Sequence, residues 1–199
     1  ICADGPAHLA FAQGSCLVEP ETVLFPNEHL VPRLAHASQI TEINAYAKRT
    51  RTSESHLVTG GTGGLGLLPA RWLAQRGANL LTLASRGGTV VRDMVDEWGH
   101  IQATAVTTRA QRCDTAETTH VRRALLVGHA RLPTTGVWHA AGVLADGVLP
   151  KQTAGSLARV CAPKMHGAWT LQHACTHTPL RTCALFSSVS ALLGGAGQA

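Results

Sequence analysis

The amino-acid sequence predicts an α/β fold in which a doubly wound parallel sheet carries helices on both faces. From His56 onward, short apolar stretches alternate with stretches that have helical spacing. The apolar stretches are continuous and do not alternate with polar residues, which is typical of parallel strands covered on both faces. The first of them runs directly into a glycine-rich turn, and a helical stretch follows that turn.

Residues 1–53 depart from this pattern and predict a separate, smaller segment. Alternating residues in Ala7–Phe11 and Glu28–Leu34 predict short strands. Prolines interrupt the segment at Pro20, Pro26 and Pro32. The segment has too little apolar mass for a core of its own. We therefore place the main domain at residues 54–199, with the polar stretch Thr50–Ser55 as the connector.

Five strands are predicted in the main domain, and most of them are short and apolar. Their ranges are His56–Thr59, Asn79–Ala84, a part of Ile101–Cys113, Gly136–Ala141 and Thr182–Phe186. Polar residues interrupt the third range, so no limits are set inside it. Turn-forming residues follow several of these stretches, as expected where a strand ends.

Four helices are predicted between the strands. Their ranges are Leu67–Gln75, Val90–Trp98, Thr115–Val127 and Thr153–Thr176. Gly77 ends the first helix, and Pro69 falls in its first turn, where a missing N–H has little effect. Pro163 lies inside the fourth helix, where a proline interrupts the hydrogen bonding. The order of strands and helices implies helical crossovers between parallel strands.

The composition is that of a globular chain, and we expect neither a membrane nor a nucleic acid as partner. Of the 199 residues, 45% are hydrophobic and 15% are charged. No stretch approaches the run of about 18 apolar residues that a membrane helix needs. Residues 1–53 carry −1 (four basic, five acidic) and residues 54–199 carry +6 (thirteen basic, seven acidic). The arginines are scattered and aromatics are 4%, which favours a small anionic ligand, or solvated surface charge, over nucleic acid.

The six cysteines predict reduced thiols, because no pair has C-x-x-C spacing, and we expect a cytoplasmic location. His173, Cys175 and His177 form an H-x-C-x-H string. On a helix, residues i and i+2 point to different faces, so we expect no metal site there.

The chain starts without Met or a signal peptide and stops at Gly-Gln-Ala, so we expect a piece of a longer protein.

The glycine-rich turn is the strongest ligand-binding signal. It reads Val58-Thr59-Gly60-Gly61-Thr62-Gly63-Gly64-Leu65-Gly66. Glycines let a backbone approach a pyrophosphate, and a helix N-terminus offers free N–H groups and positive potential. A glycine-rich structural turn is the alternative. The context predicts a Rossmann-like dinucleotide site with contacts from Gly60, Thr62, Gly63, Gly64, Leu65 and Gly66.

The end of the second strand predicts which dinucleotide binds. An NAD site would place Asp or Glu about here to hold the ribose 2′-OH. The sequence has Ser85 and Arg86 followed by two glycines. A guanidinium can hold the 2′-phosphate of NADP in a charge-assisted fork. The pair therefore favours NADPH, with a plain surface arginine as the alternative.

Three further strand ends supply candidate residues. Asp114 can meet an adenine amino group or cap a helix. The run Ala140-Ala141-Gly142 has small side chains that leave room for a cofactor, or it forms a tight turn. Ser188 follows the fifth strand, where open α/β sheets bind ligands, although serines are also common turn formers.

The run from His56 to Ala199 resembles the catalytic half of a ketoreductase domain from a type I polyketide or fatty acid synthase, in the short-chain dehydrogenase/reductase superfamily. The matching stretches are LVTGGTGGLG, LASRGG, CD, VWHAAGVLADGVL, PKMHGAWTLQ and FSSVSALLGGAGQA. Residues 1–53 resemble the end of the family's degenerate structural subdomain. The resemblance implies NADPH-dependent reduction of a β-ketoacyl thioester on the phosphopantetheine of an acyl carrier protein, with other synthase domains as partners.

The resemblance also implies catalytic residues. Ser188 corresponds to the family's catalytic serine, and Lys164 to its active-site lysine, which in this family lies on the helix before that serine. The family's catalytic tyrosine would fall two positions beyond Ala199, and Tyr46, the one tyrosine present, does not match it. We therefore expect the 199-residue chain by itself to be inactive.

The stereochemical class is implied by two positions. Leu144-Ala145-Asp146 resembles the Leu-Asp-Asp motif of ketoreductases that give D-configured products, with Ala in place of the first Asp. The opposite class carries Trp five residues after the catalytic serine, where this chain has Leu193. The resemblance therefore favours a D-configured alcohol.

Two alternatives stay open. One is an NADP-binding scaffold domain of such a synthase that has lost its catalytic activity. The other is a free-standing short-chain reductase, which would show Tyr-x-x-x-Lys downstream of the serine.

Overall fold

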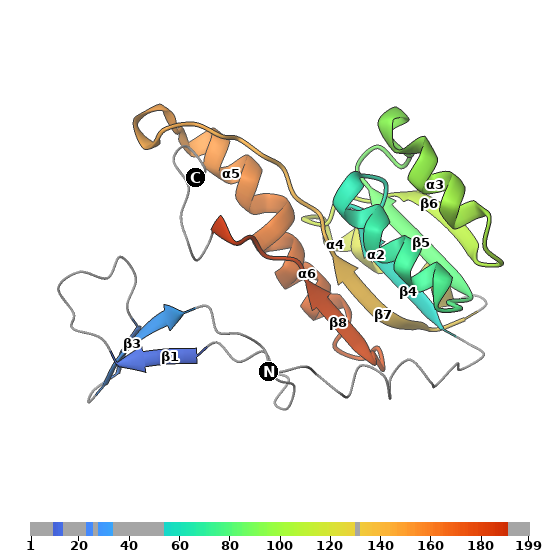
Figure 1. The fold of residues 1–199 in the computed structure, drawn as a ribbon, viewed down its shortest axis with the longest axis horizontal. Helices are drawn as coiled ribbons and strands as arrows, with labels where there is room; N and C mark the ends of the chain where they lie inside the picture. Colours follow the sequence, from blue (N-terminus) through green and yellow to red (C-terminus); the bar gives the residue numbers. More distant parts are fainter. Residues whose placement is uncertain (1–9, 14–22, 26–27, 34–53, 130–131, 191–199) are drawn as a thin grey trace. The chain divides into compact units, whose positions relative to one another are not determined.

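A computed structural model describes residues 10–13, 23–25, 28–33, 54–129 and 132–190. The chain divides into two compact units, residues 1–49 and 50–199 (Figure 1). The two units are described separately below.

The first unit contains a three-stranded antiparallel sheet in the order β1-β3-β2. The strands are β1 (Ala10–Gln13), β2 (Val23–Phe25) and β3 (Glu28–Arg33). The predicted strand 7–11 therefore reaches the described residues only at its end, and Pro32 lies within β3, paired with Phe11. In the described residues β2 pairs only with Glu28–Leu30, so Pro32 has a partner on one side, and a proline fits where its missing donor is not needed.

The second unit contains five parallel strands in the order β6-β5-β4-β7-β8 (Figure 1). Their bounds are β4 (Ser55–Thr59), β5 (Leu80–Ser85), β6 (Thr107–Arg112), β7 (Thr134–His139) and β8 (Thr182–Leu185). Thr59 pairs with Ala84 of β5 on one side and with His139 of β7 on the other. The chain winds outward from β4 to β6 and then returns to β7 on the opposite side. This order confirms the predicted doubly wound, Rossmann-like parallel sheet.

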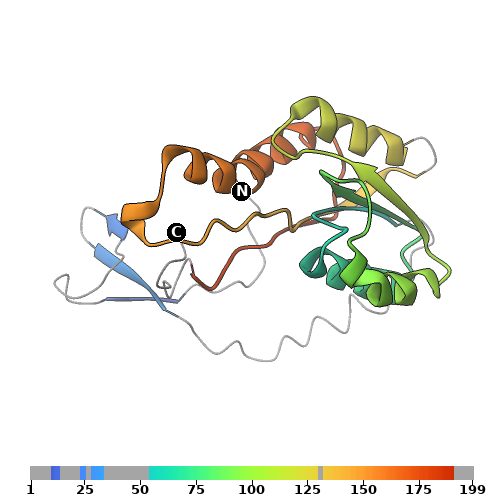
Figure 2. The same cartoon turned by 90° about the horizontal axis from the view of Figure 1, so that it is seen from above.

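Helices cover both faces of this sheet (Figures 1 and 2). They are α2 (Gly64–Gln75), α3 (Val95–Gln102), α4 (Thr118–His129), α5 (Ala154–Cys161) and α6 (Gly167–Ala174). Helices α2 and α3 share one core with Val58, while α4 and α6 share a second core with Leu57. Neighbouring residues of β4 thus enter opposite cores, which explains why the strand is buried throughout.

Several helix limits differ from the predicted ones. Helix α2 begins at Gly64, not Leu67, because the glycine-rich turn itself enters the helix after Gly63. The helix predicted at 90–98 is a short 3-10 turn η1 (Arg92–Met94) followed by α3. Helix α4 starts three residues after the predicted Thr115, because residues 114–117 form a turn of their own.

The long helix predicted at 153–176 is one continuous helical rod with an irregular middle. A π turn, η3 (Ala162–His166), joins α5 to α6 and contains Pro163. A proline cannot donate the ordinary backbone hydrogen bond, and its ring crowds the preceding turn. A π turn takes up one extra residue and so accommodates the ring without ending the helix.

Within the described ranges, none of the helices is both long and apolar enough to cross a membrane.

Candidate functional site

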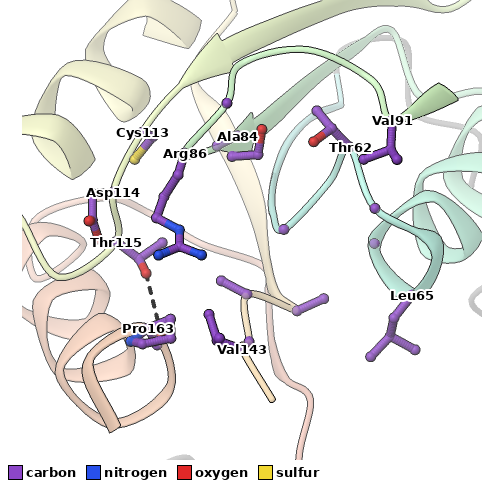
Figure 3. A pocket seen from close by; sticks show the side chains of 18 of the residues that line it. Thr62, Leu65, Ala84, Arg86, Val91, Cys113, Asp114, Thr115, Val143 and Pro163 are labelled. Carbon is purple, nitrogen blue, oxygen red and sulfur yellow. Dashed lines mark hydrogen bonds between the residues drawn. The ribbon is translucent and has the colours of Figure 1, made fainter. Parts of the chain in front are cut away.

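A cavity of about 510 Å³ opens at the carboxyl edge of the parallel sheet (Figure 3). Its walls are the β4–α2 turn, the ends of β5 and β6, the loop after β7, and Pro163 of the π turn. Open α/β sheets bind ligands at this edge, where the strand order reverses. The twelve residues predicted to contact a cofactor all line the cavity: Gly60, Thr62, Gly63, Gly64, Leu65, Gly66, Ser85, Arg86, Asp114, Ala140, Ala141 and Gly142.

Three glycines of the β4–α2 turn are required by the packing of the protein itself, and one of them is Gly61, where a Cβ would lie 2.6 Å from the carbonyl oxygen of Val58. Gly60 has a φ of +68°, and a Cβ there would lie 2.6 Å from the carbonyl oxygen of Ala140. A Cβ on Gly66 would overlap the carbonyl oxygen of Gly60. The obstructing atoms are backbone atoms, which cannot rotate away. Gly60 therefore packs the turn against the residues that follow β7, and Gly66 packs the start of α2 against the turn itself.

Gly63 and Gly64 serve a different purpose, because a side chain would fit at either position. A Cβ on Gly63 would meet only the Gly60 carbonyl oxygen at 3.7 Å, and one on Gly64 would meet Met94 Sδ at 3.5 Å. Without side chains, the backbone at the start of α2 stays bare. Helix α2 also has no side-chain cap and no acidic residue in its first turn. Its N–H groups and positive potential are thus available to an anion, and the turn fits a pyrophosphate.

Arg86 provides a cationic group on the opposite wall. The Ser85 side-chain oxygen accepts a hydrogen bond of 3.0 Å from the Gly88 N–H, and Gly88 has a φ of +70°. This tight turn directs the Arg86 side chain into the cavity (Figure 3). Among the described residues no carboxylate lies within ion-pair distance of its guanidinium. The charge is therefore free to meet an anionic ligand.

The end of β6 brings Cys113 and Asp114 to the cavity. One carboxylate oxygen of Asp114 accepts the Ala116 N–H at 3.0 Å, so the residue shapes the turn before α4 and also lines the cavity. The sequence analysis left an adenine contact and a helix cap as alternatives for Asp114; α4 begins at Thr118, so Asp114 does not occupy the position that directly precedes the helix, and the adenine contact stays a prediction. Burial, together with the neighbouring Asp114 charge, raises the pKa of the Cys113 thiol to about 11. Cys113 is therefore a neutral thiol at physiological pH, with little nucleophilic character.

The two predicted catalytic residues lie outside the cavity lining. Lys164 is an exposed residue of the π turn, and its Cε lies 3.2 Å from the point that a Cβ on Gly142 would occupy. Its side chain therefore runs beside the cavity wall. Ser188 is exposed beyond the end of β8, and its Oγ accepts the Ser190 N–H at 3.2 Å. The structure thus brings Lys164 to the edge of the site and does not place Ser188 in its lining.

The stereochemical positions are described in part. Asp146 is exposed in the loop between β7 and the 3-10 turn η2 (Leu149–Lys151). The Gln152 side-chain amide donates to the carbonyls of Ala145 at 2.9 Å and Gly147 at 3.2 Å, which holds the loop on both sides of Asp146. Leu193 lies outside the described residues.

Sequence reasoning missed several residues of the cavity. Thr89, Val91, Thr115, Val143 and Pro163 line it but were not among the candidates. The first four follow predicted strand ends at short distance, and that adjacency is a usable signal. Pro163 comes from a helix 48 residues after Thr115 in the chain, and no local pattern indicates it.

The H-x-C-x-H string lies across the end of α6, with His173 in the helix and Cys175 and His177 after it. In the described part of the chain no group of three or more His, Cys, Asp or Glu side chains is placed to hold a metal ion. His173 packs edge-on against Trp169, with ring centroids 4.7 Å apart. Burial, and then the nearby Cys183, raise the pKa of the Cys175 thiol to about 11.

Comparison with known families gives a match to the KR domain model over residues 54–199. Solved structures agree with it. The chain is similar to a structure of A-type ketoreductases from a modular polyketide synthase, at 32% identity and a TM-score of 0.78. The similarity covers 90% of this chain and 38% of that one. The chain is also similar to the first ketoreductase of the tylosin polyketide synthase, at 28% identity and a TM-score of 0.69 over 90% of this chain and 38% of that one.

Curated relatives are long multidomain proteins. The chain is 41% identical over 145 residues to the spectinabilin polyketide synthase system protein NorB of Streptomyces orinoci, covering 72% of this chain and 7% of the relative. It is 38% identical over 147 residues to the naringenin synthase of Pestalotiopsis fici, covering 72% of this chain and 5% of the relative. The chain thus spans a small fraction of the length of these relatives.

Proposed function

Because this chain belongs to the KR domain family, we propose that it forms the cofactor-binding part of a ketoreductase that reduces a β-ketoacyl thioester with NADPH. The observation that carries the proposal is the cavity at the carboxyl edge of the sheet. A bare helix N-terminus lies on one wall and Arg86, a cation with no carboxylate partner among the described residues, lies on another. That combination suits a ligand with a pyrophosphate and a further phosphate.

Different residues of the chain would bind different parts of the cofactor. The N-terminus of α2 and the turn at Gly63 would hold the pyrophosphate, Arg86 the 2′-phosphate, and Asp114 the adenine. The small residues Ala140 to Gly142 leave the end of β7 open beside the turn. When bound, the nicotinamide supplies the hydride that the β-carbon of the keto group receives. The protein's part is to fix orientation and to exclude water.

Lys164 and Ser188 are proposed as the catalytic residues of this chain. An ammonium group beside a proton-donating phenol favours the phenolate and lowers its pKa. A serine hydroxyl donates a hydrogen bond to the carbonyl oxygen as negative charge develops there. The position of Lys164 next to Gly142 supports its assignment. For Ser188 the assignment rests on the family pattern, since its side chain lies outside the cavity lining.

We further propose an acyl carrier protein as the partner that delivers the substrate, because the relatives are multidomain polyketide synthases. The product is proposed to be the D-configured alcohol, on the strength of Asp146. Chiral analysis of the alcohol formed by the synthase that carries this chain decides the configuration. An L-configured product contradicts that part of the proposal and leaves the fold unaffected.

Cofactor binding is the direct test. The chain is titrated with NADPH and with NADH, and binding is followed by nicotinamide fluorescence and by calorimetry. We expect clearly tighter binding of NADPH, since an arginine stands where an NAD site would have a carboxylate. Equal affinities contradict the NADPH assignment. Binding together with an absence of turnover in the intact synthase identifies the scaffold alternative instead.

A further inference from the structure

The π turn η3 is attached to the carboxyl edge of the sheet by two side chains. The Thr115 hydroxyl, in the loop after β6, donates to the Pro163 carbonyl at 3.3 Å (Figure 3). The His139 side chain, at the end of β7, bonds through Nε2 to the Lys164 carbonyl at 3.3 Å. Two consecutive carbonyls of the turn are therefore held by residues from two strand ends, those of β6 and β7, which are separated in the sheet by β5 and β4.

The hydrogen bonds of His139 define its protonation. A backbone carbonyl can only accept, so Nε2 carries the proton that is donated to Lys164. Nδ1 then accepts from the Thr59 hydroxyl, 2.7 Å away at the end of β4. The ring is 4% exposed, and burial lowers the pKa of His139 below its usual value. A neutral imidazole thus connects β4 through β7 to the π turn.

Close packing supports the same connection. A Cβ on Gly167, the first residue of α6, would lie 2.7 Å from the Thr115 hydroxyl oxygen and 3.1 Å from His139 Cε1. The helical rod therefore approaches the sheet at a point where both side chains converge and where no side chain of its own would fit. Gly167 is buried, so this contact is sealed from solvent.

We propose that His139 is a positioning residue that fixes Lys164 beside the cavity. The Lys164 side chain is exposed, so packing around its own methylenes gives it little support. Its backbone carbonyl is held by His139, and its Cε then lies against Gly142, a residue of the cavity wall. The significance of this placement for catalysis rests on the proposed function, whereas the placement itself does not.

The experiment observes Lys164 directly. The chain has three lysines, Lys48, Lys151 and Lys164, so reductive ¹³C-methylation gives a small set of lysine resonances that Lys→Arg variants assign. Lys151 is exposed in η2 and serves as the internal control. In the ligand-free chain we expect slower methyl motion for Lys164 than for Lys151. In His139→Leu the Lys164 methyls should become as mobile as those of Lys151.

Two variants separate positioning from general destabilisation. His139→Gln keeps a side-chain N–H donor and should restore part of the lost restraint on Lys164. Val137→Ala weakens the same strand and the same core without touching the π turn, and should leave Lys164 as in the wild type. The proposal is overturned if Lys164 keeps its wild-type motion in a folded His139→Leu chain, or if Val137→Ala loosens it equally.

If His139→Leu does not fold, a second variant still tests whether His139 positions Lys164. Thr59→Val keeps the side-chain shape but removes the hydroxyl that donates to His139 Nδ1, so the ring loses its second anchor and Lys164 should loosen by the same criterion; unchanged motion in a folded Thr59→Val chain refutes the proposal. The readout needs no cofactor. If the wild-type chain fails to bind NADPH, the proposed function is contradicted. The inference about His139 is still decided by the lysine resonances alone.

Discussion

Replacing Gly66 by alanine should destabilise the chain, whereas the same change two residues earlier should not. A Cβ on Gly66 would overlap the carbonyl oxygen of Gly60 and approach the Cα of Gly61 to 2.8 Å. A Cβ on Gly64 would meet only Met94, with the Sδ at 3.5 Å and the Cε at 3.9 Å. Both glycines lie in the first turn of α2, so the pair differs mainly in what surrounds the added methyl group.

The expected magnitudes follow from two opposing effects. Alanine in a helix is ordinarily more stable than glycine by about 0.5–1 kcal/mol. Overpacking costs about 1–3 kcal/mol, and the upper end applies to Gly66 because backbone atoms obstruct the methyl group. Gly66→Ala should therefore lower the free energy of unfolding by about 2 kcal/mol. Gly64→Ala should leave the free energy of unfolding unchanged or raise it by up to about 1 kcal/mol.

Thermal unfolding followed by circular dichroism measures the difference. For a chain of this size about 2 kcal/mol corresponds to a Tm lowered by about 4–8 °C in Gly66→Ala. Gly64→Ala should keep the wild-type Tm or exceed it slightly. Equal losses in the two variants, or a Gly66→Ala chain as stable as the wild type, would show that the close packing of the β4–α2 turn is not what requires glycine.

Three further outcomes are expected. Arg86→Ala should weaken NADPH binding by about 1.5–3 kcal/mol and spare NADH, whereas Arg122→Ala, which removes the same charge from α4, should affect neither; calorimetry compares them, and parallel losses would indicate a general charge effect. Iodoacetamide at pH 8 should modify the exposed Cys183 well before Cys113, whose pKa is raised to about 11 by burial; peptide mapping gives the order, and similar rates would contradict it. Burial lowers the pKa of His56 despite the opposing Glu54 charge, so the unfolded chain takes up the proton first and stability should fall as the pH drops below about 6.5; His56→Gln should flatten this slope in urea titrations at several pH values.

Much of the sheet could be predicted because its central strands are local in sequence and buried on both faces. The third strand resisted precise limits for a physical reason. Among the described strands β6 lies at one end of the sheet, and most of its residues are exposed. Its polar sequence, TTRAQR, therefore lacks the apolar run that marks β4 and β5. The residues Val90, Met94 and Trp98 all pack against one core, although the α-helix predicted from Val90 begins only at Val95.

The candidate site likewise has a part that could be predicted from the sequence and a part that could not. Glycines of the turn and the residues after each strand could be predicted, because parallel strands bring their carboxyl ends to one edge. Contacts between distant segments could not. The bond from Thr115 to Pro163 joins residues 48 positions apart, and the link from Thr59 to His139 joins residues 80 apart. A proline inside a helix signals an interruption, but only the folded chain shows that a π turn absorbs it.

The extra residue of the π turn also sets the rotational phase of everything that follows it. One residue corresponds to about 100° around an α-helix. In α6 the buried residues are Gly167, Thr170 and Leu171, whereas α5 has none. Deleting a single residue within 162–166 would convert the turn to regular helix and rotate α6 by that angle, which would carry Leu171 out of the core. A one-residue deletion at the centre of the rod would therefore misplace every buried contact of α6 at once, whereas a substitution at one of its exposed positions would leave those contacts in register.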